Sequence, residues 1–180
     1  KRAKGDEHFM RVIQSVGVML LALSSVVACS EDGQKQQSGR DVQEIASLGE
    51  PLCVEQKLSA TASASSTENA NFPASLAVDG NATTRWSSAF ADPQWIQLDF
   101  GARRQISRVV LSWEAAASKS YSLGASDSAT GPFTTIYSDI NADGGVDSIA
   151  GLNAQARYLR ITSTARLTPY GNSLFEFEAY

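Results

Sequence analysis

The sequence predicts an all-β fold, an antiparallel β-sandwich or jelly roll, and two observations carry this prediction. Beyond residue 57, apolar residues alternate with polar ones at a period of two over short stretches, as in strands with one buried face. Turn-forming segments rich in glycine, proline and asparagine separate these stretches, and no helical periodicity lies between them. At 180 residues and 43% hydrophobic content, the chain suffices for one such domain with appended segments.

The alternation is clearest in WIQLDF, residues 95–100, where residues 96, 98 and 100 are apolar and share one face. Further strands are expected over residues 106–113, 120–126, 133–137, 157–164 and 173–180. Turns are expected at residues 99–101, 129–132 and 141–145. Trp86, Trp95 and Trp113 stand in or beside apolar strands, so we expect them in the core rather than as exposed sugar platforms.

The first 28 residues have the pattern of an export signal. Arg11 follows Met10, an apolar run extends to Ala28, and small residues precede Cys29. The segment resembles a bacterial lipoprotein signal peptide, to which residues 1–9 are extraneous. This resemblance implies a lipid on Cys29 and a place in the bacterial cell envelope, at an outer membrane and facing the periplasm or the cell surface. The alternatives are an ordinary cleaved signal or a membrane anchor, for which the apolar run is short.

Removal of residues 1–28 takes away His8, the one histidine of the sequence. The remainder carries 11 basic and 17 acidic residues, a formal charge of −6, which argues against nucleic acid as a partner. A chain without histidine has no Ser-His-Asp triad and no ordinary zinc site. Cys53 is then the only unmodified thiol, so an intrachain disulfide is excluded. The polar residues 29–56 are expected to form a flexible linker.

Three blocks of the sequence, in their order along the chain, indicate a family: SASSTENANFPASLAVDGNATTRWSSAFADPQWIQLDFG, then ISRVVLSWEAAASKSYSLGASD, then TARLTPYGNSLFEFEAY. Together they resemble the discoidin or coagulation factor 5/8 type C family, and within it the bacterial family-32 carbohydrate-binding modules. The resemblance implies an eight-stranded, galactose-binding-like jelly roll over residues 57–180. It also implies a non-catalytic domain that binds a poly- or oligosaccharide through loops at one end of the sandwich.

The same resemblance implies a sugar-binding site where several loops converge. Its predicted residues are Glu68, Arg85, Phe90, Glu114, Arg166, Tyr170 and Asn172. An aromatic face would contact the C–H side of a pyranose, and charged and amide groups would bind its hydroxyls. Phe90 stands where some such modules carry an acid, which disfavours a strongly cationic ligand such as chitosan and suits a neutral glycan. Alternatively, Arg85 only braces the fold by pairing with Glu68 or Glu114.

The stretch LAVDGNATTRW, residues 76–86, suggests a calcium loop. An acid, an amide and a hydroxyl lie within six residues, with a glycine that permits a tight turn. One loop offers too few ligands, and the resemblance adds two main-chain carbonyls and a carboxylate from the last strand. The predicted ligands of this structural Ca²⁺ are Leu76, Asp79, Asn81, Thr84, Phe175 and Glu176. The alternative is a turn held by its own side chains without a metal.

Two other functions stay open. A discoidin domain of the blood-protein type would bind lipid head groups or a protein through apolar loop tips, with Phe72 and Phe90 as candidates. Such domains usually close with a terminal disulfide, for which Cys53 has no partner. A docking domain would attach a partner enzyme or another protein. Glu176 and Glu178, two apart on one strand, could resemble a glycosidase pair, but neither would reach the loop cleft.

Overall fold

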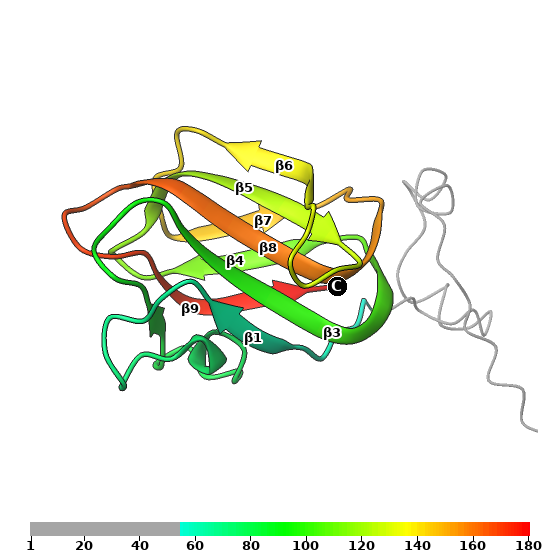
Figure 1. The fold of residues 1–180 in the computed structure, drawn as a ribbon, viewed down its shortest axis with the longest axis horizontal. Helices are drawn as coiled ribbons and strands as arrows, with labels where there is room; N and C mark the ends of the chain where they lie inside the picture. The colour runs from blue at the N-terminus through cyan, green and yellow to red at the C-terminus, as the bar shows by residue number, and fades with distance from the viewer. Residues whose placement is uncertain (1–54) are drawn as a thin grey trace, which may run out of the picture. The chain divides into compact units, whose positions relative to one another are not determined.

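The computed structural model describes residues 55–180, which form a sandwich of two antiparallel sheets (Figure 1). The expected signal peptide, Cys29, Cys53 and nearly all of the expected linker lie outside the described residues. Within residues 55–180, no helix is long and apolar enough to cross a membrane. The all-β prediction is confirmed.

Each sheet combines strands from distant parts of the chain. The first has the order β1 (Thr61–Ala64), β3 (Gln94–Ile106), β8 (Ala154–Arg166), β5 (Ser118–Ser126) and β6 (Thr134–Asp139). The second has the order β2 (Trp86–Ser87), β9 (Ser173–Ala179), β4 (Val109–Trp113) and β7 (Val146–Ile149). A 3₁₀ helix, η2 (Ala74–Ala77), lies between β1 and β2 in the chain. The described residues thus contain nine strands where eight were expected, and β2 has only two residues.

The predicted turn at residues 99–101 is wrong, because β3 continues through it. The register between β3 and β8 shifts between Asp99 and Arg104, so the glycine marks a bulge rather than a chain reversal. Gly101 has a φ of 73°, and its N–H donates to Asp99 Oδ1 at 2.7 Å. A side chain at this φ would be strained, and that requirement explains the glycine.

The apolar faces of the two sheets meet in the core. Ile96 and Leu98 of β3 pack there with Leu111 of β4 and Phe177 of β9, all fully buried. Trp86 and Trp113 are core residues, as predicted, with exposed fractions of 2% and 5%. Trp95 is different: it lies half-buried on the outer face of β3, where the Arg160 guanidinium stacks 4.3 Å from its ring. The Arg160 guanidinium also lies 4.1 Å from the centre of the Phe133 ring.

A polar contact between the sheets fixes the end of β4. Asp147 Oδ2 on β7 accepts hydrogen bonds from Trp113 Nε1 at 2.8 Å and from the Tyr121 hydroxyl on β5 at 2.7 Å. Burial and the bond to Asp147 raise the pKa of Tyr121 well above its ordinary value, so the phenol stays a donor. Because Glu114 follows Trp113 directly, this contact also fixes where the β4–β5 loop begins.

The two ends of the described chain meet at one end of the sandwich. The Leu58 N–H donates to the Ala179 carbonyl at 2.8 Å, and Tyr180 exchanges main-chain hydrogen bonds with Arg108. From there β4 runs to Trp113, while β9 runs back from Ser173. The β4–β5 and β8–β9 loops therefore lie at the opposite end (Figure 1).

Candidate functional site

The loops opposite the chain ends surround an open cavity of about 360 Å³. Its lining residues are Glu68, Arg85, Ser87, Phe90, Glu114, Ala115, Ala116, Thr168 and Tyr170. Five of the seven residues predicted for sugar binding are among them, brought together from five separate loops. The two others, Arg166 and Asn172, are not.

Phe90 and Tyr170 form an aromatic corner at the cavity. Phe90 lies on the β2–β3 loop and Tyr170 on the β8–β9 loop, and their side chains are 51% and 63% exposed. The rings meet edge to face, with centroids 5.9 Å apart and an interplanar angle of 81°. Large aromatic rings normally bury their faces, so exposed rings at a cavity offer apolar area to a ligand.

Two carboxylates line the same cavity. Glu68 is exposed and Glu114 is half-buried, and neither forms an ion pair with any residue from 55 to 180. Glu114 Oε2 accepts a hydrogen bond from the Ala116 N–H at 2.9 Å, which fixes its orientation. Both groups therefore keep acceptor capacity for a ligand.

Arg85 is held by an aromatic ring rather than by an acid. Its guanidinium stacks 4.0 Å from the centre of the Phe72 ring, and Nη1 donates to Ser173 Oγ at 3.3 Å. The alternative in which Arg85 pairs with a glutamate is therefore not what the structure shows. Phe72 is half-buried beneath this guanidinium, which differs from the exposed loop tip considered for it. Only the fold brings the two residues together, so no local sequence signal marked the contact.

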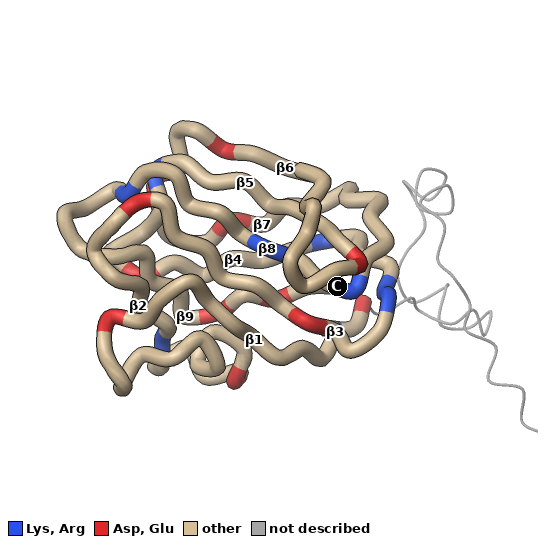
Figure 2. The backbone as a smooth tube through the Cα atoms, viewed as in Figure 1, with Lys and Arg blue, Asp and Glu red and all other residues tan. Residues whose placement is uncertain are grey.

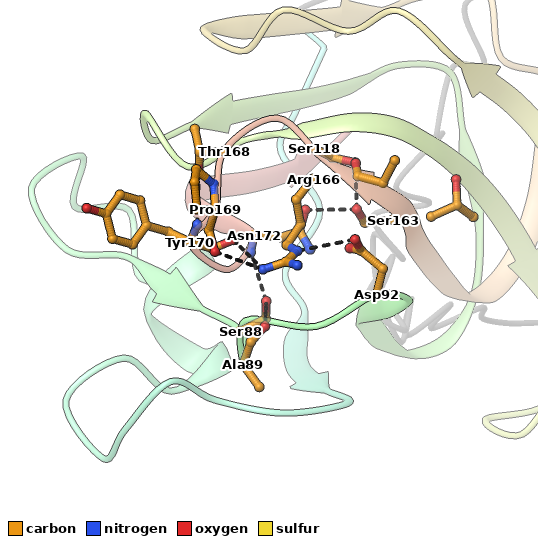
Figure 3. A network of polar contacts seen from close by, with 12 residues as sticks. Ser88, Ala89, Asp92, Ser118, Ser163, Arg166, Thr168, Pro169, Tyr170 and Asn172 are labelled. Carbon is orange, nitrogen blue, oxygen red and sulfur yellow. Dashed lines mark hydrogen bonds and ion pairs between the residues drawn. The ribbon is translucent and has the colours of Figure 1, made fainter.

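Arg166 braces loops instead of lining the cavity, which corrects the expectation that it contacts sugar. Its Nε donates to Asp92 Oδ2 at 3.2 Å, and Nη1 donates to the carbonyls of Pro169 and Tyr170 at 3.0 and 3.1 Å (Figure 3). These three acceptors occupy the guanidinium on the side facing the loops. Arg166 thus joins the β8–β9 loop to the β2–β3 loop.

Asn172 is buried, with an exposed fraction of 1%, and this corrects its assignment as a sugar-binding residue. Its Oδ1 accepts a hydrogen bond from Ser163 Oγ at 2.8 Å, and its N–H donates to Ser88 Oγ at the same distance. Its Nδ2 has no hydrogen-bond partner among the described residues. The side chain points into the structure beneath the loop, so it cannot face the cavity.

The β8–β9 loop is pressed against β2 and the residues that follow it. The Ser88 N–H donates to the Asn172 carbonyl at 2.9 Å. A Cβ built on Gly171 would overlap the Ser88 carbonyl oxygen. Only glycine permits this approach, and the sequence reasoning did not single it out.

The predicted calcium loop is a compact turn. Asp79 Oδ1 accepts a hydrogen bond from the Asn81 N–H at 2.9 Å, and Oδ2 accepts one from Thr84 Oγ1 at 2.8 Å. Asn81 Oδ1 accepts bonds from the N–H and hydroxyl of Thr83. These bonds hold the turn by its own side chains, as the metal-free alternative expects.

Glu176 is the unusual member of this region. Its side chain is 7% exposed, both carboxylate oxygens lack hydrogen-bond partners within residues 55–180, and Lys57 Nζ lies 3.6 Å from Oε2. Burial raises the pKa of Glu176, the charge of Lys57 opposes this rise, and the negative charge of Asp79 adds to it. A buried carboxylate left without partners is costly unless a cation compensates it.

The donor set fits calcium by its chemistry. Residues 55–180 contain no cluster of three or more His, Cys, Asp or Glu side chains placed to hold a metal. The predicted set has two carboxylates, Asp79 and Glu176, and otherwise amide, hydroxyl and main-chain oxygens. Ca²⁺ accepts such mixed oxygen ligands. The two carboxylate oxygens of Glu176, which have no hydrogen-bond partner among the described residues, would be ligands of such an ion.

The described residues thus form a β-sandwich whose loops surround an open cavity with aromatic and acidic walls. Residues 60–176 match the F5/8 type C domain, and the chain belongs to that family. One similar solved structure is chitosan-binding module 1 of a chitosanase/glucanase from Paenibacillus sp. IK-5, with 46% identity and a TM-score of 0.67, covering 70% of this chain and 99% of that one.

Chitosan-binding module 2 of the same enzyme, solved in complex with chitotriose, has 45% identity and a TM-score of 0.65, and covers 68% of this chain and 97% of that one. Among curated proteins, the polysaccharide lyase 8 family protein HylA of Enterococcus faecalis is 32% identical over 117 residues. That match covers 61% of this chain but only 8% of the lyase, so it concerns one domain of a much longer protein.

Proposed function

We propose that residues 55–180 form a non-catalytic module that binds an amino-sugar oligosaccharide in the cavity lined by Phe90 and Tyr170. The observation that carries the proposal is the combination, in one open cavity, of an exposed aromatic corner with two carboxylates that form no ion pair with any residue from 55 to 180. The likeness to two chitosan-binding modules, at 45% and 46% identity, supports the same class of ligand.

Each group would have a distinct part in binding. The Tyr170 ring would pack on the C–H face of a pyranose, with Phe90 as a second wall. Glu68 and Glu114 would accept hydrogen bonds from sugar ammonium and hydroxyl groups, and Arg85 would donate to hydroxyl oxygens. Glu176 and Glu178, the one carboxylate pair considered for hydrolysis, lie on β9, pair with Lys57 and do not line this cavity. Affinity would be modest, about 10 µM to 1 mM.

The decisive comparison is between chitotriose and cellotriose, which differ only at the 2-position of each ring. Isothermal titration at pH 6, where the amines carry charge, should show that chitotriose binds at least about tenfold more tightly than cellotriose. This factor corresponds to a difference in binding free energy of about 1.4 kcal/mol. Glu68→Gln and Glu114→Gln should weaken chitotriose binding severalfold and leave cellotriose unchanged. Asp127→Asn, an exposed acid outside the cavity, is the matched control.

Phe90 stands where some modules of the family carry an acidic residue. This favours a second ligand class, the neutral glycans. Equal or tighter binding of cellotriose would overturn the amino-sugar assignment in favour of a neutral glycan. No binding of either trisaccharide, or of laminaritriose, would contradict saccharide binding and favour the docking of a protein partner.

We also propose that one structural Ca²⁺ is held by Asp79 and Glu176, with oxygens of Leu76, Asn81, Thr84 and Phe175. The ion would neutralise both carboxylates and tie β9 to the loop after η2. With Ca²⁺ at 100 times its Kd, linkage gives about 2.7 kcal/mol, or a rise in Tm of roughly 10 °C over the chelated protein. Glu176→Gln should remove this rise. Equal Tm values with calcium and with chelator would contradict the proposal.

For the segment outside the described residues, we propose that Cys29 carries the lipid that anchors the protein in a bacterial envelope. Metabolic labelling with an alkyne fatty acid should mark the full-length protein and not the Cys29→Ser variant. Release of the unmodified wild-type chain into the soluble fraction would contradict the anchor.

A further inference from the structure

We propose that Arg166 and Asp92 form a clamp that fixes the two loops carrying Phe90 and Tyr170, so that the aromatic corner is in place before a saccharide arrives. The inference rests on the proposed function of the cavity. It assigns Arg166 and Asp92, neither of which lines the cavity, as positioning residues for binding.

One guanidinium links both loops (Figure 3). Its Nε binds Asp92, two residues after Phe90, and its Nη1 binds the carbonyl of Tyr170 itself. The ion pair is partly shielded, with side-chain exposures of 21% for Arg166 and 31% for Asp92. A planar fork of donors can reach a carboxylate and two carbonyls at once, which the single ammonium of lysine does less well.

The β8–β9 loop is also anchored on its other side. Beyond Tyr170, Asn172 exchanges two hydrogen bonds with Ser88, and Gly171 rests against the Ser88 carbonyl. The loop is therefore held on both sides of Tyr170, whose ring is 63% exposed. Asn172 is a buried anchor of the loop. The Arg166–Asp92 pair is partly exposed, so a polar substitution can break it without opening the core.

Fixing both rings in advance removes an ordering cost that would otherwise oppose binding. Release of the clamp should therefore weaken binding without removing any ligand contact. Loss of Asp92 removes only the ion pair, whereas loss of Arg166 also removes the hydrogen bonds to the carbonyls of Pro169 and Tyr170. Arg166→Gln should therefore weaken binding at least as much as Asp92→Asn, and loss of both side chains should cost no more than loss of Arg166 alone.

The test is a double-mutant cycle with Asp92→Asn, Arg166→Gln and the double variant, titrated with chitotriose. Each single variant should bind about 3- to 10-fold more weakly, the double variant no more weakly than the worse single one, and Arg166→Lys should recover part of the loss. Asp99→Asn breaks a better-aligned ion pair with Arg157 away from the cavity, and it should leave affinity unchanged. Tm values measured in parallel should fall at least as much in Asp99→Asn as in Asp92→Asn, so a loss of affinity confined to Asp92→Asn does not follow from lower stability.

Weakened binding in Arg166→Gln with unchanged binding in Asp92→Asn would overturn the clamp and indicate that Arg166 acts on the ligand directly. Additive losses would also overturn it. Hydrogen exchange of the ligand-free protein provides a readout that does not depend on the ligand: main-chain amides 167–171 should exchange faster in both single variants than in the wild type. If wild-type protein fails to bind chitotriose, the proposed function fails, and this exchange result still decides whether the clamp exists.

Discussion

The Arg85 guanidinium lines the cavity and forms no ion pair with any described acid, because Phe72 and Ser173 hold it instead. Of its five N–H donors, one binds Ser173, so others stay available to a ligand. An arginine already paired with a carboxylate would have to exchange that partner before binding a hydroxyl. Stacking on an aromatic ring orients the group while leaving its edge free.

Replacement of Phe72 by leucine should therefore weaken saccharide binding by about 2- to 5-fold, the equivalent of the 0.5–1 kcal/mol of an exposed cation–π contact. Phe72→Tyr, which retains a ring face, should bind as the wild type does. Titration with the trisaccharide that the wild type binds measures both. Unchanged affinity in Phe72→Leu would mean that Ser173 alone orients Arg85.

Asp99 and Arg157 form the best-aligned ion pair of the described residues, with Nε and Nη2 donating to the two carboxylate oxygens at 2.8 and 3.0 Å. The hydrogen bonds from Arg157 lower the pKa of Asp99 below its ordinary value; burial opposes this, and the Gly101 N–H lowers it further. Since the folded pKa lies below the unfolded one, the pair stabilises the fold above about pH 4 and loses this contribution as pH falls through the folded pKa.

Asp99→Asn should consequently lower the Tm at pH 6, and the difference from the wild type should shrink as the pH falls below about 4 toward pH 2. Thermal unfolding followed by circular dichroism at pH 6 and at pH 2 checks this. An equal difference at both pH values would show that the asparagine disturbs the β3 bulge by other means.

The sequence predicted which loops form the cavity better than it predicted which of their side chains point into it. Glu68, Glu114 and Tyr170 were placed by family resemblance and do line the cavity. Arg166 is the last residue of β8 and Asn172 lies on the same loop as Tyr170. The sequence places both beside Tyr170 but does not show whether a side chain turns outward. The partners of Arg166 are mainly backbone carbonyls, which every residue carries, so no residue pattern could reveal them.

At the scale of elements, the β8–β9 loop depends on its close approach to the chain after β2. Gly171→Ala should force this loop away from Ser88, lower the free energy of unfolding by about 1–3 kcal/mol, and weaken saccharide binding because Tyr170 moves with the loop. Denaturant unfolding and titration measure the two effects.

Gly151→Ala is the matched control for that variant. Gly151 has a φ of 72° in the β7–β8 loop at the opposite end, and its Cβ would meet nothing within 4 Å. The substitution should lower stability through backbone strain and leave affinity unaltered. Equal affinity losses in both variants would show that binding follows overall stability rather than the position of the loop.

Strands with a clear alternation of apolar and polar residues were predictable, and the others were not. The six expected strands correspond to β3, β4, β5, β6, β8 and β9. The short edge strands β1 and β7, with the sequences TASA and VDSI, bury little apolar surface and carry no readable pattern. At residue 101, the glycine signalled an irregularity, but a bulge and a turn both call for positive φ.

For the whole described domain, the site and the chain ends lie at opposite ends of the sandwich. Basic positions gather beside the C-terminus (Figure 2), where Arg108 stacks 3.9 Å from the centre of the Tyr180 ring and pairs with Glu55 at 2.7 Å. A carrier attached before residue 55 or after Tyr180 should therefore leave the cavity free. Surface-based binding measurements on protein immobilised through either end should give the same affinity, and a loss confined to one end would contradict this arrangement.

The hydrogen bond between Leu58 and Ala179 brings the two ends of the domain within one strand spacing of each other. A short linker could therefore join them, and new termini could be opened elsewhere, for example in the exposed segment 127–130 between β5 and β6. Such a circular permutant should retain the cavity. By the same geometry, the domain can be inserted into a surface loop of a host enzyme, since its chain would leave and re-enter that enzyme at nearly one point.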